Sequence, residues 1–188
     1  MSAYFQREQK LEKPRALLPE LIHYPTGLWI DAASGDGVFA EALIELGGAS
    51  LTMLGLDLQR PVLKSFLAAV NTPHTMSAVL QADLASPLPL KGADGILLAN
   101  GLHFFKHDAQ IKVLRNCAQA LKNQGLLILV EYNTTHPTGA VPFPVPKSEN
   151  ERLLISSGFH PPKAHSTVKS SYLGEMYAVL AAVRSEEC

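Results

Sequence analysis

The chain has 188 residues, 47% hydrophobic and 18% charged, which favours a single domain over residues 1–188 with a substantial core. Its formal net charge of −1 excludes capture of nucleic acid by a strong basic field, and no apolar run approaches the ~20 residues that a membrane span needs. Its two cysteines, Cys117 and Cys188, exclude a disulfide framework and a zinc cluster, so the expected compartment is a reducing cytoplasm.

The first segment, residues 1–27, predicts a polar lead followed by a short helix. Leu17, Leu18 and Leu21 place apolar side chains on one face of that helix. Pro14 is expected near its start, because the first turn needs no N–H from that position.

Five apolar runs alternate with helical patterns through the middle of the chain. Strands are predicted at residues 28–31, 51–57, 78–82, 93–100 and 126–131, and helices at about 38–46, 61–70 and 109–122. The uninterrupted aliphatic run at 126–131 is typical of a parallel strand covered on both faces. The middle of the chain therefore predicts an α/β fold.

The C-terminal part has a different pattern. Residues 132–147 include a proline-rich, apolar stretch that cannot be a central strand or a helix interior, and a loop of this length is expected to cover something, as a lid does. A helix is predicted at 149–156. Two strand-like runs follow at 164–170 and 176–183, and the gap between them permits an antiparallel hairpin but no helical crossover.

A glycine-containing turn, residues 31–37, follows the first predicted strand. Gly35 and Gly37 lack a β-carbon, so the backbone can take a positive φ there or let a ligand approach closely. The helix that begins near Val38 offers unpaired N–H groups and a partial positive charge at its start. Asp31 would suit a cationic amino group, and Asp57 ends the second strand, where an acid accepts both hydroxyls of a ribose.

Three interpretations of this turn compete. A dinucleotide-binding oxidoreductase needs G-x-G-x-x-G, which no glycine at position 38 or 40 completes, and a P-loop needs Gly-Lys-Ser/Thr, which is absent. Residues 31–37, Asp-Ala-Ala-Ser-Gly-Asp-Gly, resemble the first motif, acid-x-Gly-x-Gly-x-Gly, of the class I (Rossmann-like) S-adenosylmethionine-dependent methyltransferases, with Ala33 in place of the first glycine. The C-terminal hairpin also matches that family, whereas a dinucleotide-binding fold more often continues with a parallel strand.

The resemblance extends from about residue 28 to residue 183 and implies the fold of that family. This is a seven-stranded, mostly parallel, doubly wound sheet of order 3-2-1-4-5-7-6, with the last strand antiparallel and helices on both faces. Residues 131–133, 141–146 and 172–177 are similar to small bacterial-type methyltransferases with unassigned substrates. In the family an N-terminal helix often covers the cofactor or substrate; the alternative is a helix that caps the sheet edge.

The resemblance implies S-adenosyl-L-methionine as the cofactor, lying across the carboxyl ends of strands one to four. Carried over onto this sequence, its contacts are Asp31, Ala33, Gly35 and Gly37 for the methionine part, Asp57 for the ribose, Leu58, Asp83 and Leu84 for the adenine, and Asn100 near the methionine part. Each polar residue also has a structural interpretation. In these structural interpretations, Asp57 caps the next helix, Asp83 stabilises a turn, and Asn100 hydrogen-bonds to the backbone of its own loop.

The implied reaction is direct, in-line methyl transfer, in which positioning matters most and a base is needed only if the acceptor must lose a proton. His103, just beyond the fourth strand, is the first candidate base, and Tyr132, at the end of the fifth strand, is the second. The alternative is that both side chains only shape the pocket, His103 by stacking on Phe104 or Phe105. No metal site is predicted, because His103 and His107 lack a third ligand.

The expected acceptor is a small molecule, because the nearly neutral chain carries no added domain that would read a macromolecule. Neither nucleic acid nor membrane is an expected partner, and the sequence does not define an oligomeric state. Two rival functions stay open. One is a non-catalytic protein that binds S-adenosylmethionine or S-adenosylhomocysteine (SAH), and the other is an NAD(P)-dependent oxidoreductase.

Overall fold

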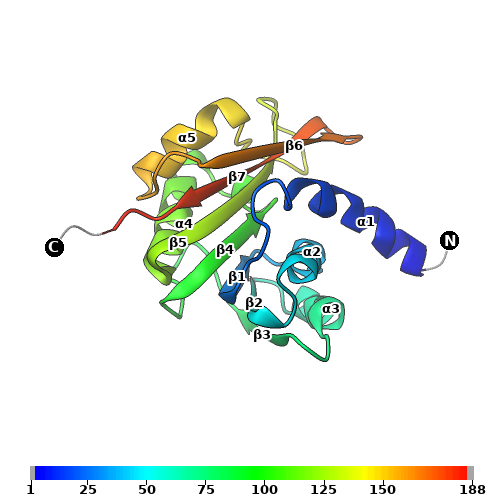
Figure 1. The fold of residues 1–188 in the computed structure, drawn as a ribbon. Coiled ribbons are helices and arrows are strands. Elements are labelled where there is room, and N and C mark those ends of the chain that lie inside the picture. The colour runs from blue at the N-terminus through cyan, green and yellow to red at the C-terminus, as the bar shows by residue number, and fades with distance from the viewer. Residues whose placement is uncertain (1–2, 186–188) are drawn as a thin grey trace.

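The computed structural model describes residues 3–185, and within them seven strands form one sheet (Figure 1). The strands are β1 (Gly27–Ala32), β2 (Leu51–Asp57), β3 (Met76–Gln81), β4 (Ala93–Ala99), β5 (Leu121–Tyr132), β6 (Ala164–Ser170) and β7 (Gly174–Ala182). Their order is β3-β2-β1-β4-β5-β7-β6. β1 to β5 pair in parallel, and β7 runs antiparallel to both β5 and β6. The predicted fold class, strand order and antiparallel last strand are confirmed.

Helices cover both faces of the sheet (Figure 1). One face carries α1 (Ala3–Leu17), α2 (Val38–Gly47) and α3 (Arg60–Val70), and the other carries α4 (His107–Ala120) and α5 (Lys147–Ser156). Short 3-10 helices, η1 (Gly48–Ser50) and η2 (Leu102–Phe104), lie in the connections. Successive strand residues point to opposite faces, so Trp29 and Leu97 pack with α1 to α3, whereas Ile30 and Ile96 pack with α4 and α5. The sheet is therefore buried on both sides.

The N-terminal helix is longer than the sequence predicted. α1 begins at Ala3, and Pro14 lies inside it rather than near its start. Proline removes one intrahelical hydrogen bond, but Pro14 is close to the C-terminal end, and its carbonyl still accepts the N–H of Leu18 at 2.9 Å. The predicted start of the helix near Pro14 was therefore wrong.

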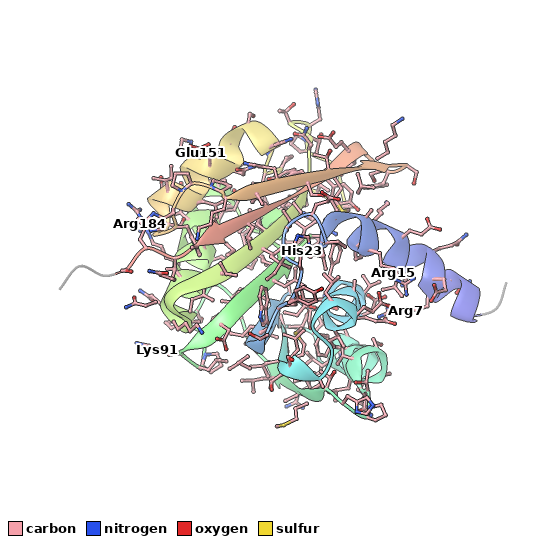
Figure 2. The ribbon with its side chains drawn as sticks, viewed as in Figure 1. Arg7, Arg15, His23, Lys91, Glu151 and Arg184 are labelled. Atoms are coloured by element: carbon pink, nitrogen blue, oxygen red, sulfur yellow. The ribbon has the colours of Figure 1, made fainter. Side chains whose placement is uncertain are left out.

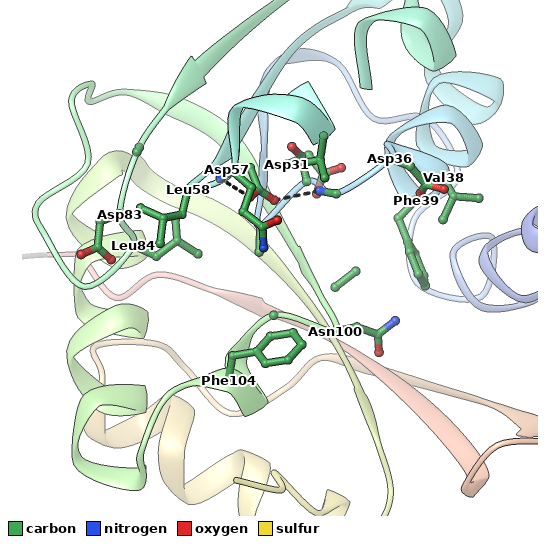
Figure 3. Close-up of a pocket in the computed structure, with 18 of the residues that line it drawn as sticks. Asp31, Asp36, Val38, Phe39, Asp57, Leu58, Asp83, Leu84, Asn100 and Phe104 are labelled. Carbon is green, nitrogen blue, oxygen red and sulfur yellow. Dashed lines mark hydrogen bonds between the residues drawn. The ribbon is translucent and has the colours of Figure 1, made fainter. Parts of the chain in front are cut away.

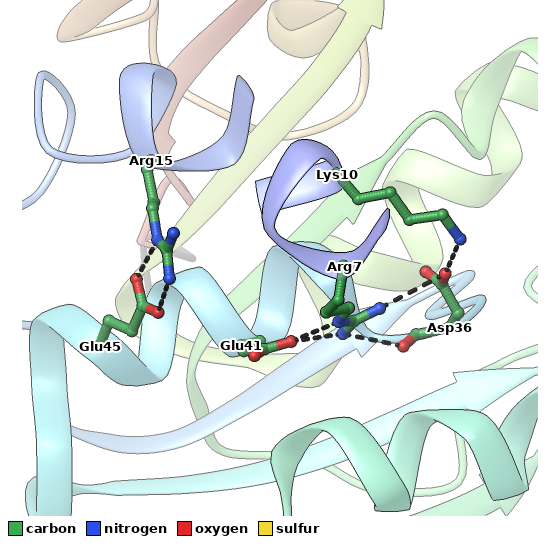
Figure 4. Close-up of polar contacts among 6 residues, drawn as sticks. All are labelled: Arg7, Lys10, Arg15, Asp36, Glu41 and Glu45. Carbon is green, nitrogen blue, oxygen red and sulfur yellow. Dashed lines mark hydrogen bonds and ion pairs between the residues drawn. The ribbon is translucent and has the colours of Figure 1, made fainter. Parts of the chain in front are cut away.

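Ion pairs connect this polar helix to α2. Arg7 and Arg15 both project from α1 (Figure 2), and the Arg7 Nε lies 2.7 Å from Glu41 Oε2. The Arg15 Nε lies 2.8 Å from Glu45 Oε2 (Figure 4). Leu11 on the same helix is almost fully buried. The partners of α1 are distant in sequence, so its own pattern could not reveal them.

The proline-rich loop between β5 and α5 is packed down rather than projecting. Val145 is 1% exposed, and its carbonyl accepts the hydroxyl of Tyr177 at 2.8 Å. The N–H of Phe143 donates to the carbonyl of His103 at 3.0 Å. Residues 133–147 line neither of the two cavities described below. The loop therefore anchors the turn after β4, and its role as a lid stays a prediction.

The junction of α4 and β5 also differs from the prediction. The helix ends at Ala120 and the strand begins at the next residue, Leu121, which pairs with Ala93 of β4. A register shift follows on β4, and Gln124 takes a left-handed φ of 59°. Because of this irregularity, residues 121–125 show neither an alternating nor a continuous apolar pattern, so the sequence did not predict them as part of the strand.

Two further features concern the expectations from composition. No helix in the described range is long and apolar enough to cross a membrane.

Cys117 lies buried on α4, and burial raises the pKa of its thiol to about 12. The second cysteine, Cys188, lies outside the described residues.

Candidate functional site

A cavity of about 470 Å³ opens at the carboxyl ends of β1, β2 and β4 (Figure 3). Ligands of open α/β sheets bind at this edge, where the strand order reverses, and the volume suits a small molecule. The wall consists of Asp31, Ala33, Ser34, Gly35, Asp36, Val38, Phe39, Asp57, Leu58, Gln59, Val62, Ala82, Asp83, Leu84, Ala99, Asn100, Gly101, Phe104 and Phe105. We call this the first cavity.

The turn after β1 has three residues in the left-handed region: Ala33 (φ 60°), Gly35 (φ 51°) and Gly37 (φ 75°). A β-carbon added to Gly35 would meet no atom within 4 Å, so the backbone there is open to a ligand. Gly37 does not line the cavity, and a β-carbon on it would lie 2.9 Å from the ring of Phe66. Close packing against α3 and the left-handed φ both account for this glycine, and the contact of Gly37 with the methionine part stays a prediction.

The carboxylate of Asp57 connects β2 to this turn. Its Oδ2 accepts the N–H of Gly35 at 3.1 Å, and its Oδ1 accepts the N–H of Gln59, the N-cap residue of α3, at 2.9 Å. The side chain is only partly buried and lines the first cavity. Asp57 therefore has the predicted position at the strand tip and also a structural role at the start of the next helix.

The first cavity is strongly acidic, since the carboxylates of Asp31, Asp36, Asp57 and Asp83 all line it. Burial raises the pKa of Asp31 well above its usual range, and the nearby carboxylates of Asp57 and Asp36 raise it further. A cationic ligand would stabilise the ionised form of Asp31, whereas a phosphate would be repelled. The electrostatics therefore favour a positively charged ligand over a dinucleotide.

One of these acids is also held from outside the cavity. Asp36 Oδ2 lies 2.7 Å from the Nζ of Lys10 and 3.4 Å from a guanidinium nitrogen of Arg7 (Figure 4). A second guanidinium nitrogen of Arg7 donates to the Asp36 carbonyl at 3.2 Å. The N-terminal helix is thereby fastened to the turn that forms the floor of the site.

Apolar side chains dominate the end of the first cavity near β2 and β3. Leu58 and Phe104 are 61% and 60% exposed, respectively, and Leu84 is buried. Such surfaces suit a flat ring placed between them. Asp83 is exposed at this end, and its Oδ1 accepts the N–H of Ala85 at 2.9 Å. This is the turn-stabilising contact that the structural interpretation of Asp83 predicts.

Asn100 follows β4 in a left-handed conformation, φ 53°. Its N–H donates to the carbonyl of Val130 at 2.9 Å, which fixes the residue between β4 and β5. The side-chain Oδ1 is buried and has no hydrogen-bond partner within residues 3–185, and the same is true of Ser34 Oγ in the first cavity. A buried acceptor left unpaired costs about 1–3 kcal/mol, so a ligand with N–H or O–H groups would be stabilised here.

A second cavity of about 490 Å³ adjoins the first. Val38, Phe39 and Asn100 line both cavities, and Tyr132 and Met176 continue the wall of the second. Its remaining wall comes from α1, through Gln6, Gln9, Lys10, Lys13 and Pro14. The sequence predicted Tyr132 near the reaction site and an N-terminal helix that covers the cofactor or substrate, but it did not assign residues 6–13 to that helix.

His103 is buried behind the first cavity rather than facing into it. The side chain is 3% exposed, and its Nδ1 lies 2.6 Å from Oε2 of the fully buried Glu131. Oε1 of Glu131 accepts the N–H groups of Leu102 at 2.9 Å and His103 at 3.2 Å. The ring packs against Phe104 at a centroid distance of 4.4 Å. The pair therefore holds the turn after β4.

Most of the residues predicted to contact the cofactor line the first cavity. Eight predicted cofactor residues, Asp31, Ala33, Gly35, Asp57, Leu58, Asp83, Leu84 and Asn100, line the first cavity, and Gly37 does not. The prediction missed Asp36, Phe39 and Phe104 as wall residues. Asp36 lies inside the quoted motif, and Phe104 lies in the turn after β4, so position alone could have indicated both.

Comparison with known proteins adds the family. A family model described as a methyltransferase domain matches residues 30–129. No curated protein matches the sequence. The matched segment extends from β1 into β5 and contains every wall residue of the first cavity.

Several solved methyltransferases share the fold at low sequence identity. Mitomycin 7-O-methyltransferase MmcR is 18% identical, with a TM-score of 0.71, and the match covers 93% of this chain and 54% of that one. Magnesium protoporphyrin IX methyltransferase from Synechocystis PCC 6803, solved with bound SAH, is 18% identical, with a TM-score of 0.68 and coverage of 86% and 75%.

A third similar structure is NcsB1, an O-methyltransferase from neocarzinostatin biosynthesis in complex with SAH and 1,4-dihydroxy-2-naphthoic acid. It is 18% identical, with a TM-score of 0.68, and the match covers 96% of this chain and 56% of NcsB1. This chain spans about half the length of MmcR, 54%, and of another match, TnmH, 50%. At these identities the similarity establishes the fold alone.

Proposed function

Because the chain belongs to the methyltransferase-domain family, we propose that it transfers the methyl group of S-adenosylmethionine directly to a small-molecule acceptor. The family and cofactor implied by the sequence resemblance are confirmed. The observation that best supports the proposal is the acidic first cavity, which adjoins a second cavity at Asn100. One holds a cationic donor and the other holds an acceptor.

The residues of the first cavity fit this cofactor. The buried carboxylate of Asp31 would bind the amino group, and Asp57 would accept the ribose hydroxyls. Leu58 and Leu84 would pack on the adenine, with Asp83 accepting its amino group. When bound, S-adenosylmethionine supplies an activated methyl group on a sulfonium centre. The unpaired Asn100 Oδ1 would lie at the junction where that methyl group meets the acceptor.

The protein contributes mainly by positioning the two reactants. In-line transfer requires a near-attack arrangement and exclusion of competing water, and it needs no base when the acceptor is already a nucleophile. Tyr132 lines the second cavity and is our candidate for direct contact with the acceptor. His103, paired with Glu131 and buried, is our candidate for positioning the turn that carries Asn100. Burial raises the pKa of Tyr132, so its phenol would serve as a hydrogen-bond donor at neutral pH.

A small-molecule acceptor is supported by two of the similar structures. MmcR is named for methylation of mitomycin, and NcsB1 was solved with a dihydroxynaphthoic acid. An oxidoreductase is disfavoured, because the turn lacks the third glycine of G-x-G-x-x-G and the sheet ends in an antiparallel hairpin.

The proposal is tested by measuring methyl transfer from S-adenosylmethionine to a small-molecule acceptor. Purified protein is incubated with isotopically labelled S-adenosylmethionine and a small-molecule extract, and labelled products are separated and identified by mass spectrometry. The proposal predicts a labelled product together with SAH, and loss of both with Asp57→Ala. Tight SAH binding without product from any acceptor fraction would instead favour the non-catalytic binding protein. Oxidation or reduction of a nicotinamide cofactor would favour the oxidoreductase.

A further inference from the structure

The second cavity carries information about the acceptor, because its wall combines features that the first cavity lacks. It lies between α1 and the carboxyl-terminal end of β5, and it shares Val38, Phe39 and Asn100 with the first cavity. The side chain of Asn100 extends away from Phe104, on the side of Phe39 (Figure 3). A molecule in the second cavity would therefore meet the cofactor at Asn100.

The charge on this wall comes from Lys13. The cationic residues Arg7, Lys10 and Arg15 on the same helix each pair with a carboxylate. Lys13 is half-buried, and its Nζ donates to Ser170 Oγ at 3.3 Å. Among the residues that the structure describes, no carboxylate lies within ion-pair distance of it. A half-buried ammonium group without an anionic partner favours an anion on the ligand.

The part of the wall opposite α1 is largely apolar and aromatic. Phe39 is 8% exposed and Met176 is 3% exposed. Tyr132 is partly buried, and its ring meets that of Tyr172 edge-on at a centroid distance of 5.8 Å. Aromatic and thioether side chains of this kind pack well on a flat ring. The body of the acceptor is therefore expected to be aromatic or otherwise apolar.

The third feature is the buried Oδ1 of Asn100, which accepts no hydrogen bond within residues 3–185. An acceptor atom at the junction is satisfied by an O–H or N–H on the molecule that receives the methyl group. In that transfer the oxygen or nitrogen forms the new bond to the methyl carbon, the carbon–sulfur bond breaks with its electron pair going to sulfur, and the proton is released to water.

We propose that the acceptor is an aromatic or apolar acid with a hydroxyl or amino group, whose anion binds Lys13 and whose nucleophilic group hydrogen-bonds to Asn100. This inference rests on the proposed function, since it assigns the substrate class of the same site. It places selectivity for charge on α1, remote from the residues that fit the cofactor.

The test uses SAH-loaded protein and matched pairs of probes. Hydroxybenzoates, aminobenzoates and hydroxycinnamates are compared with their neutral primary amides, and dissociation constants are measured by ligand-observed NMR. We expect at least one carboxylate to bind about tenfold tighter than its amide, as a charge-assisted hydrogen bond predicts. In Lys13→Gln this preference should shrink to within about twofold, while Lys13→Arg should retain it.

The matched control is Lys112→Gln, which removes an exposed lysine of α4 on the other face of the sheet. It should keep the preference of the unmodified chain, and all variants should keep the same SAH affinity. The inference is overturned if no carboxylate binds better than its amide, or if the preference survives in Lys13→Gln. Failure of the unmodified, folded chain to bind SAH overturns the proposed function itself, and this inference with it.

Discussion

The carboxylate of Asp57 accepts the backbone N–H of Gly35 at 3.1 Å, so the tip of β2 is tied to the turn that follows β1. This contact joins the two strand ends that would hold the ribose and the methionine part of one cofactor. The same carboxylate accepts the N–H of Gln59 at 2.9 Å. Loss of Asp57 would therefore remove the proposed contact with the ribose and also loosen the turn.

Asp57→Ala should weaken SAH binding by about 10- to 100-fold, because hydrogen bonds to a charged group contribute about 1.5–3 kcal/mol. Isothermal titration of the variant and of the unmodified chain measures this change. Asp108→Ala, which removes an exposed carboxylate from the first turn of α4, is the control and should bind as the unmodified chain does. An unchanged affinity in Asp57→Ala would exclude Asp57 from the cofactor site.

Asp31→Asn should stabilise the free protein while weakening the binding of S-adenosylmethionine. Burial raises the pKa of Asp31 well above its usual range, so the folded state holds a proton that the unfolded state has lost. The free energy of unfolding therefore falls as the pH rises from the usual carboxyl pKa to the raised one. In Asp31→Asn this position does not titrate, so it causes no fall in the free energy of unfolding over this pH range.

The measurement is thermal unfolding from pH 4 to pH 8, with and without S-adenosylmethionine. Without ligand, Asp31→Asn should show the higher Tm at the upper end of this range and a weaker decline with pH. With ligand, the increase in Tm should be smaller than for the unmodified chain, because the buried carboxylate no longer binds the cation. A lower Tm without ligand at pH 8 would mean that the carboxylate is stabilising in the free protein.

Ala33 and Gly101 form a packed pair in the floor of the site. Ala33 has a left-handed φ of 60°, and a β-carbon added to Gly101 would lie 2.6 Å from the β-carbon of Ala33. Ala33→Gly should raise the stability by about 0.5–1 kcal/mol, since the relief of left-handed strain, about 1–2 kcal/mol, exceeds the added entropy of the unfolded glycine. Gly101→Ala should lower the stability by about 1–3 kcal/mol through overpacking.

A double-mutant cycle checks the contact by urea unfolding. In the double variant Ala33→Gly/Gly101→Ala the clash between the two β-carbons is absent, so Gly101→Ala should cost less than it does alone. Part of the cost should persist, because Leu98 Cδ1 would lie 3.1 Å from the new β-carbon. Strictly additive effects would show that the two positions do not interact.

Arg7→Gln should loosen α1 without unfolding the protein. Arg7 pairs with both Glu41 and Asp36, and each pair is partly exposed, so together they contribute about 1 kcal/mol or less. Amide hydrogen exchange in α1 should speed up by about two- to fivefold, with exchange in β4 and β5 unchanged. Arg152→Gln, which breaks an exposed pair with Glu149 on α5, is the control and should leave exchange in α1 unaffected.

Glu131→Ala should be the most destabilising of these substitutions. It leaves the N–H groups of Leu102 and His103 and the ring of His103 without their buried acceptor. The expected loss is about 3–5 kcal/mol, or a fall in Tm of about 10 °C, measured by urea and thermal unfolding. Glu149→Ala, an exposed site on α5, should change stability by less than about 0.5 kcal/mol. A comparably small effect for Glu131→Ala would show that the turn after β4 does not depend on this carboxylate.

The strand tips were predictable because their signals are local. An apolar run followed by Asp31, Asp57 or Asn100 marks a strand end, and parallel strands bring such ends to one edge of the sheet. The fold of the tail was predictable for a similar reason, since a gap of a few residues permits only a hairpin.

Features that depend on distant partners were not predictable in this way. In the helical segment 3–13, Arg7 and Lys10 pair with acids on and before α2, and a polar segment carries no sign of those partners. For the same reason the sequence predicted a covering N-terminal helix without residues 6–13, several of which line the second cavity. The burial of His103 follows from Glu131, which a different strand supplies. Gly37 matched a motif, but its need for glycine comes from Phe66 of α3.

The most direct test of the central claim is calorimetric titration of the purified chain with SAH, with NADH as the comparison ligand. The fit of the first cavity to an adenosyl ligand predicts micromolar or tighter binding of SAH and much weaker binding of NADH, because the turn after β1 lacks the third glycine of the dinucleotide motif. Binding of NADH in preference to SAH, or binding of neither ligand by the folded protein, would contradict the assignment of this cavity to S-adenosylmethionine.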